Sequence, residues 1–255
     1  MPGINIDIVI PILGAAAAGL VGAFALMKRT ILAGDVMSHI AIPGLGLAII
    51  WKLNPLVGGA LTLFAGILMI WVLQKKTELS SEAAIGVLFA SSVALGALLI
   101  HSDEGLIDAL FGGFKAVSPA EFFFGIAASG IIIITLWLLR QKLIISLFSP
   151  ELAASAGIKV NRVNLYFLLL FGLAILASLR FLGALLVGSL IIIPASAARQ
   201  LTHTLGAFLA ASALIAMASV IIGFWIAARY ALDPGPTVVV VASAFFVISL
   251  FKQKI

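Results

Sequence analysis

The chain has 255 residues, of which 63% are hydrophobic and 10% are charged; soluble domains average about 45–50% and about 25%. This composition excludes a soluble globular protein, because too little polar side-chain surface is available to cover one. The net charge of +5 does not indicate nucleic-acid binding, since the basic residues stand singly or in pairs at the ends of apolar runs. The chain contains no cysteine, so any metal would need His, carboxylate or backbone oxygen ligands.

The apolar runs predict an all-α integral membrane protein that forms a single domain over residues 1–255. A transmembrane helix needs about 20 apolar residues, and runs of about this length recur along the whole chain. The first run is expected to remain in the mature protein, because Lys28 and Arg29 follow it and do not precede it. We predict about nine spans, at residues 8–27, 31–50, 55–74, 83–101, 119–139, 163–181, 183–198, 204–228 and 236–251.

The basic residues divide unevenly between the two sides of such a bundle. If each span crosses once, 11 of the 15 lie on one side and four, Lys52, Lys115, Arg180 and Arg229, lie on the other. Because the basic side of a membrane protein is normally cytoplasmic, the N-terminus is predicted to be outside and the C-terminus inside. This orientation requires an odd number of spans.

A longer cytoplasmic connection is predicted at residues 141–162. Within it, Ser149, Pro150 and Glu151 form a helix-start signal, and Gly157 is a typical helix stop. These residues predict a two-turn helix at the cytoplasmic surface. Such a helix could dock a partner or simply link two spans.

An acid and an imidazole stand four residues apart in the second predicted span. Asp35 and His39 would share one helix face, about 6 Å apart along the helix axis. Ionisable groups are costly inside a bilayer and are therefore the first functional candidates. Together they suit Zn²⁺ or Mn²⁺, although the pair could instead hold helices together or relay protons. Pro43 and Gly44 favour a local break of the helix beside this pair.

The remaining polar residues are weaker candidates. His101 and Asp103 stand near the end of a span, where solvated loop groups are common. Arg199 and His203 are typical of anchoring at the membrane surface, and residues 233–236 are typical of an external turn. The nucleotide-binding pattern G-x-x-x-x-G-K-[ST] does not occur in the sequence, so any ATP would have to be hydrolysed by another subunit.

Several sequence blocks, taken together, resemble the membrane subunit of bacterial and archaeal zinc, manganese and iron ABC importers. They are spread over nearly the whole chain: GDVMSH at residues 34–39 with Pro43 and Gly44, LFGG at 110–113, GALLV at 183–187, and DPGP at 233–236. Two features depart from the family pattern. Gly113 stands where the family often has an acid, and the last block is two residues shorter than usual.

The resemblance implies a homodimeric permease of the cell membrane. It would associate with two cytoplasmic P-loop ATPase subunits and receive a divalent metal from an extracytoplasmic metal-binding protein. It would not be an enzyme and would hold no cofactor stably. The metal-pathway residues would be Asp35 and His39. The surface helix would couple to the ATPase through Pro150, Glu151, Ala153, Ala154 and Gly157.

Two other classes of function remain open from the residues alone. A proton-coupled secondary metal transporter would use Asp35 and His39 to exchange protons for substrate and would need no ATPase. An intramembrane metalloenzyme would use the same pair around a catalytic metal. The metalloenzyme is less favoured, because no other cluster of metal ligands or bases stands within a predicted span.

Overall fold

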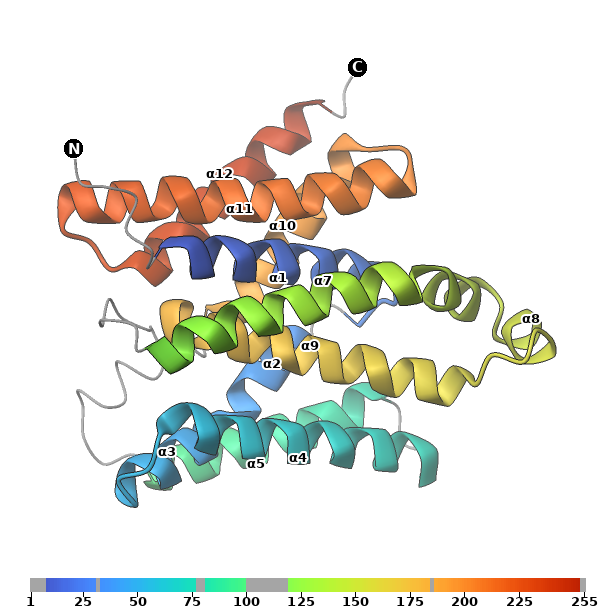
Figure 1. Cartoon of the computed structure of the whole chain (residues 1–255), viewed down its shortest axis with the longest axis horizontal. Coiled ribbons are helices and arrows are strands. Elements are labelled where there is room, and N and C mark those ends of the chain that lie inside the picture. Colours follow the sequence, from blue (N-terminus) through green and yellow to red (C-terminus); the bar gives the residue numbers. More distant parts are fainter. Residues whose placement is uncertain (1–7, 31–32, 77–80, 100–118, 184–185, 253–255) are drawn as a thin grey trace.

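The structure is a computed structural model, which describes residues 8–30, 33–76, 81–99, 119–183 and 186–252. These residues form a bundle of α-helices (Figure 1) and contain no β-strand. The helices are α1 (Val9–Met27), α2 (Ala33–Ile40), α3 (Ile42–Ile50), α4 (Pro55–Lys76), α5 (Ser81–Leu99), α7 (Pro119–Phe148), α8 (Pro150–Ser155), α9 (Val160–Leu182), α10 (Val187–Leu201), α11 (Leu205–Tyr230) and α12 (Pro234–Lys252).

Helix α1 lies at the centre of the packing. It contacts α7, α9, α10 and α11, and in Figure 1 it runs between α11 on one side and α7 and α9 on the other. Helices α3, α4 and α5 pack together as a second group, which joins the first through α2 and α9. The short helix α8 projects beyond the bundle at one end (Figure 1).

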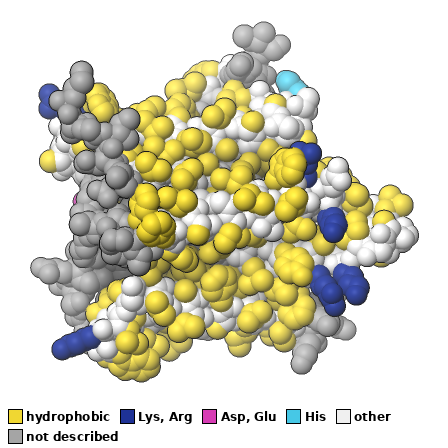
Figure 2. Space-filling view, viewed as in Figure 1, with side chains coloured by type: hydrophobic (Ala, Val, Ile, Leu, Met, Phe, Trp, Pro, Cys, Tyr) yellow, Lys and Arg dark blue, Asp and Glu magenta, His cyan; other side chains and the backbone are white. Residues whose placement is uncertain are grey.

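The surface of the bundle is apolar where a bilayer would surround it. Among the described residues, six helices are long and apolar enough to cross a membrane: α1, α4, α7, α9, α11 and α12. Three shorter apolar segments, Val36–Ile50, Ile85–Leu99 and Val187–Leu201, lie among them. Figure 2 shows hydrophobic side chains over the broad middle of one face, with Lys and Arg toward its two ends. The prediction of an all-helical membrane protein is therefore confirmed, with six long spans in the described residues.

Some predicted boundaries differ from the structure. Helix α7 continues to Phe148, past the predicted end at residue 139. The apolar run ends at Arg140, but the helix goes on, with Arg140 and Lys142 exposed on it. The predicted turn at residues 233–236 is mostly the start of α12, which begins at Pro234. Proline is favoured in a first helical turn, where its missing N–H costs nothing.

Glycines allow the closest helix contacts in both groups. A Cβ at Gly22 of α1 would overlap the backbone carbonyl of Ile191 in α10. In the second group, a Cβ at Gly44 of α3 would overlap the carbonyl of Gly58 in α4. Small residues that let helix backbones approach this closely are a common means of association in lipid.

Candidate functional site

The imidazole of His39 lies inside the bundle. It is 8% exposed, and its ring packs edge-on against Phe89 of α5, with 5.0 Å between ring centroids and 79° between ring planes. Its neighbours in α2, Met37 and Ser38, are fully buried. A buried imidazole whose ring is held by an aromatic neighbour is fixed in orientation. This is a useful property for a ligand or a proton carrier.

Asp35 lies in α2 one helical turn before His39, so the two Cα positions share a face of this helix. The Asp35 side chain lies outside the part of the chain that the structure describes. Helix α2 contacts α4, α5, α9 and α10. The pair therefore stands on an element that the bundle surrounds, and not on a peripheral helix.

The helix that carries this pair is interrupted at Ala41. The backbone N–H of Ala41 donates to the carbonyl of Ser38, three residues earlier, and α3 then begins with Pro43 in its first turn. Proline has no N–H to continue the α-helical ladder, so Pro43 contributes to the interruption at this point. The next residue, Gly44, packs closely against the backbone of Gly58 in α4. The break thus lies within one turn of His39.

Thr62 of α4 borders the interruption. Its hydroxyl lies 3.4 Å from the carbonyl oxygen of Ala41 and 3.3 Å from the carbonyl oxygens of Gly58 and Gly59. Sequence reasoning did not single out Thr62 or Phe89. An aromatic or a threonine inside an apolar run carries no signal of its own, because only the packing of α4 and α5 against α2 and α3 brings them to the site.

No group of three or more His, Cys, Asp or Glu side chains comes together in the described residues in a way that could hold a metal ion. This finding does not include the Asp35 carboxylate. The other candidates lie elsewhere: His203 and Arg199 are exposed near the end of α10. His101, Asp103 and Gly113 lie outside the described residues.

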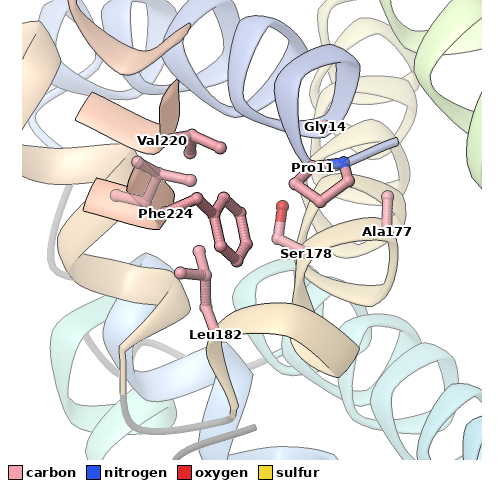
Figure 3. A pocket seen from close by; sticks show the side chains of 8 residues that line it. Pro11, Gly14, Ala177, Ser178, Leu182, Val220 and Phe224 are labelled. Carbon is pink, nitrogen blue, oxygen red and sulfur yellow. The ribbon is translucent and has the colours of Figure 1, made fainter. Parts of the chain in front are cut away.

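The described cavity beside Ser178 is unsuited to a metal. It has a volume of about 10 Å³, room for about one water molecule. Its walls come from α1, α9, α10 and α11, and the Ser178 hydroxyl and the Phe224 ring point into it (Figure 3). The Ser178 hydroxyl is buried and has no hydrogen-bond partner within the described protein. A single hydroxyl among apolar side chains offers no carboxylate or imidazole ligand.

The predicted surface helix is present as α8. The Ser149 side chain accepts a hydrogen bond from the backbone N–H of Leu152 at 3.3 Å and so caps the helix. Gly157, with φ of +74°, ends this segment in the left-handed conformation that glycine adopts readily. Ala153 is fully buried, whereas Ala154 and Glu151 are exposed. One face of α8 therefore packs on its own chain, and the other is exposed beyond the bundle.

Helices packed through small residues, an apolar belt and a buried ionisable residue on an interrupted helix define a polytopic membrane transport protein. The chain belongs to the ABC 3 transport family, whose model matches residues 4–253. This confirms the resemblance stated from the sequence blocks: the chain is a membrane permease subunit of the metal importer class.

The relatives agree over almost the whole length. The chain is 33% identical over 240 residues to the "High-affinity zinc uptake system membrane protein ZnuB" of Haemophilus influenzae, covering 91% of each chain. It is 29% identical to the "Manganese transport system membrane protein MntC" of Halalkalibacterium halodurans, covering 91% of this chain and 81% of the relative. The solved structure of PsaBC from Streptococcus pneumoniae in complex with Fab is 27% identical, with a TM-score of 0.85, over 97% of this chain and 91% of the other.

Proposed function

We propose that the chain forms the translocation pathway of an ATP-driven importer that carries zinc or manganese, or iron, across the cell membrane. The observation that carries the proposal is the buried His39, one turn after Asp35 on an interrupted helix, in a chain of the ABC 3 transport family. Similarity to a zinc uptake protein and to a manganese transport protein supports these metals as cargo.

Nine crossings fit the chain best. The six long helices supply six, and the three shorter apolar segments supply the others if each crosses once. An odd number agrees with the charge distribution, which orients the N-terminus outside and the C-terminus in the cytoplasm. Helix α8 then lies on the cytoplasmic side.

Energy comes from outside this polypeptide. The sequence has no P-loop, so ATP is hydrolysed by separate cytoplasmic subunits that two copies of this permease bind. An extracytoplasmic metal-binding protein delivers the ion. The exposed face of α8, with Glu151 and Ala154, contacts the ATPase and transmits its movement. Pro150, Ala153 and Gly157 shape and anchor this helix.

Asp35 and His39 are the cargo ligands in this proposal. A carboxylate oxygen and a neutral imidazole nitrogen suit borderline divalent ions better than alkali ions. The helix is interrupted at Ala41, within one turn of His39, and transporters commonly place their ion sites at such breaks. The ring contact with Phe89 keeps the imidazole in one orientation.

The metal step is tested by uptake of radioactive zinc and manganese into proteoliposomes that contain the full complex, with ATP and without a proton gradient. Asp35→Asn removes the charge and His39→Ala removes the nitrogen donor, so each should abolish uptake while assembly persists. His203→Ala is the matched control, because His203 is exposed near the end of α10. Undiminished uptake by both site variants would overturn the ligand assignment. If uptake by the unaltered protein instead requires a proton gradient and persists without ATP, the secondary transporter is favoured.

The coupling role of α8 has its own test. Ala154→Arg places a long charged side chain on the exposed face of α8 and should abolish both ATPase association and ATP-driven uptake. Ala228→Arg, at an exposed position near the end of α11 far along the chain from α8, is the control and should retain both. Ala153 is unsuitable for this purpose, since it is buried and its replacement would disturb the fold. Normal copurification and uptake with Ala154→Arg would leave α8 as a plain linker.

A further inference from the structure

A groove of about 720 Å³ lies at the end of the bundle near α8. It is formed where four helices begin or end: the last turns of α1, α7 and α10, and the first turn of α11. Phe148, which lines it, stands just before α8. The groove therefore lies at the ends of helices that are long and apolar enough to cross a membrane, among them α1 and α11.

The polar part of the groove is positive. Lys28, Arg29 and Arg199 line it, and its described lining includes no acidic residue. The Lys28 ammonium donates a hydrogen bond of 2.6 Å to the Asn164 Oδ1 atom of α9, which leaves the two exposed arginines as the main cations toward the groove. The N-terminus of the long helix α11, capped by Thr204, adds the positive end of its helix dipole.

The rest of the groove is apolar. Phe148 is 78% exposed and Leu205 is 38% exposed, whereas Phe208, which also lines the groove, is buried. A small soluble anion would use the arginines and leave these side chains uncovered. An amphiphile with a negative head and hydrocarbon chains would cover both parts. The adjoining charged and apolar walls therefore match one class of ligand, an anionic lipid.

We propose that this groove binds an anionic phospholipid, whose phosphate contacts Arg29 and Arg199 and whose acyl chains lie against Phe148 and Leu205. Arginine forms bidentate hydrogen bonds with phosphate oxygens, and its stem packs on apolar surface. The site is separate from the cargo ligands and from the exposed face of α8. Binding would tie the ends of α1, α7, α10 and α11 together beside the coupling helix.

The test measures lipid binding to the purified full chain in an uncharged detergent, by native mass spectrometry with dioleoyl phosphatidylglycerol and dioleoyl phosphatidylcholine. The unaltered chain should prefer phosphatidylglycerol, and high salt should weaken this preference. The double variant Arg29→Gln/Arg199→Gln should bind phosphatidylglycerol about 25-fold more weakly, at about fivefold for each charge removed. The matched control Arg140→Gln/Arg162→Gln removes two exposed arginines outside the groove lining and should retain the affinity.

A second variant keeps the test decisive if the double variant folds poorly. Phe148→Ser removes an exposed apolar wall and should weaken phosphatidylglycerol binding without affecting the binding of inorganic phosphate. Equal lipid affinity in the groove variants and the control would overturn the proposal. Competition by glycerol phosphate as strong as that by the lipid would also overturn it. Lipid binding needs no metal transport, so a failure here is distinguishable from a failure of the cargo assignment.

Discussion

The first two predicted spans are neighbours in the chain and are built from similar small and apolar residues, yet they fold differently. Helix α1 is one continuous helix of 19 residues with no charged residue inside it, and 72% of its apolar window is buried. The second span is divided into α2 and α3 at Ala41 and carries Asp35 and His39. Both use a glycine, Gly22 or Gly44, to press against another backbone.

The difference shows that close packing and interruption have separate causes. A glycine contact alone does not break a helix, because α1 remains regular at Gly22. A proline alone does not break one either, since α10 continues through Pro194. The second span combines Pro43, which cannot donate a backbone hydrogen bond, with Gly44, which lets α4 approach at the next residue. We infer that α1 serves as a packed scaffold, whereas α2 and α3 carry the residues proposed as cargo ligands.

The largest effect on stability is expected from adding one methyl group to the scaffold. Gly22→Ala would place a Cβ against the carbonyl of Ile191 and force α1 away from α10. Overpacking of this kind costs about 1–3 kcal/mol. Gly130→Ala in α7 is the matched control, because nothing lies within 4 Å of a Cβ built there. The measurement is the thermal midpoint of the purified protein in detergent. A similar midpoint for both variants would contradict the role of α1 as a tightly packed centre.

A smaller and different effect is expected from restoring a donor at the interruption. Pro43→Ala adds a backbone N–H at the start of α3 and should let the helix run on from α2. We expect ATP-driven metal uptake to fall about fivefold, equivalent to about 1 kcal/mol in the barrier, while the thermal midpoint stays the same or rises. Pro194→Ala in the continuous α10 should change uptake less. A larger loss of uptake with Pro194→Ala would reverse the assignment of roles to the two helices.

Much of the scaffold was predictable from the sequence. Apolar run length located the six long helices and the three shorter apolar segments to within a few residues at most ends. Ser149, Pro150 and Gly157 correctly predicted the helix α8. These features depend on local chemistry: the missing N–H of proline, the side-chain cap, the positive φ of glycine and the length of an apolar run. Family membership was also predictable, because the blocks around residues 34–39 and 183–187 occur together.

The surroundings of the candidate site were not predictable in the same way. Phe89 and Thr62 meet α2 and α3 only because α4 and α5 fold back onto them. The groove at the end of α1 collects residues from α1, from α7 and from the junction of α10 and α11, three segments that are far apart in sequence. The extension of α7 to Phe148 was missed because a helix can leave the bilayer and continue. Each of these features depends on contacts between distant segments, which run length and spacing do not encode.

A still smaller change is expected from removing one interhelical hydrogen bond of the scaffold. The Ser212 hydroxyl of α11 donates to the backbone carbonyl of Gly19 in α1 at 2.6 Å, and both residues are buried. Bonds of this type in membrane proteins contribute on average about 0.6 kcal/mol. Ser212→Ala should therefore lower the thermal midpoint slightly and leave uptake intact. Ser91→Ala, where an exposed hydroxyl bonds within its own helix, should have no measurable effect. A loss of uptake with Ser212→Ala would show that α1 does more than support the fold.

A different kind of effect is expected at the end of α1, where stability should depend on pH. Lys28 lies just beyond the last residue of this helix, with its ammonium over the Phe167 ring, 4.7 Å from the centroid. Burial lowers the pKa of Lys28 from 10.5 to about 8. Below about pH 8 the folded and unfolded chains both hold this proton, whereas between about 8 and 10.5 the unfolded chain holds it and the folded chain has released it. The contribution of Lys28 to stability therefore rises with pH across this window.

Lys28→Met removes the titrating group and should flatten that rise. The measurement is the thermal midpoint from pH 7.5 to pH 10, compared with Lys142→Met, which removes an exposed lysine of α7 and should retain the slope of the unaltered protein. Other groups titrate over the same range, but they are shared by all three proteins, so the difference in slope isolates Lys28. A slope in Lys28→Met equal to that of the unaltered protein would mean that the end of α1 leaves this lysine solvated. The buried scaffold would then stop short of Lys28, at the last apolar residues of α1.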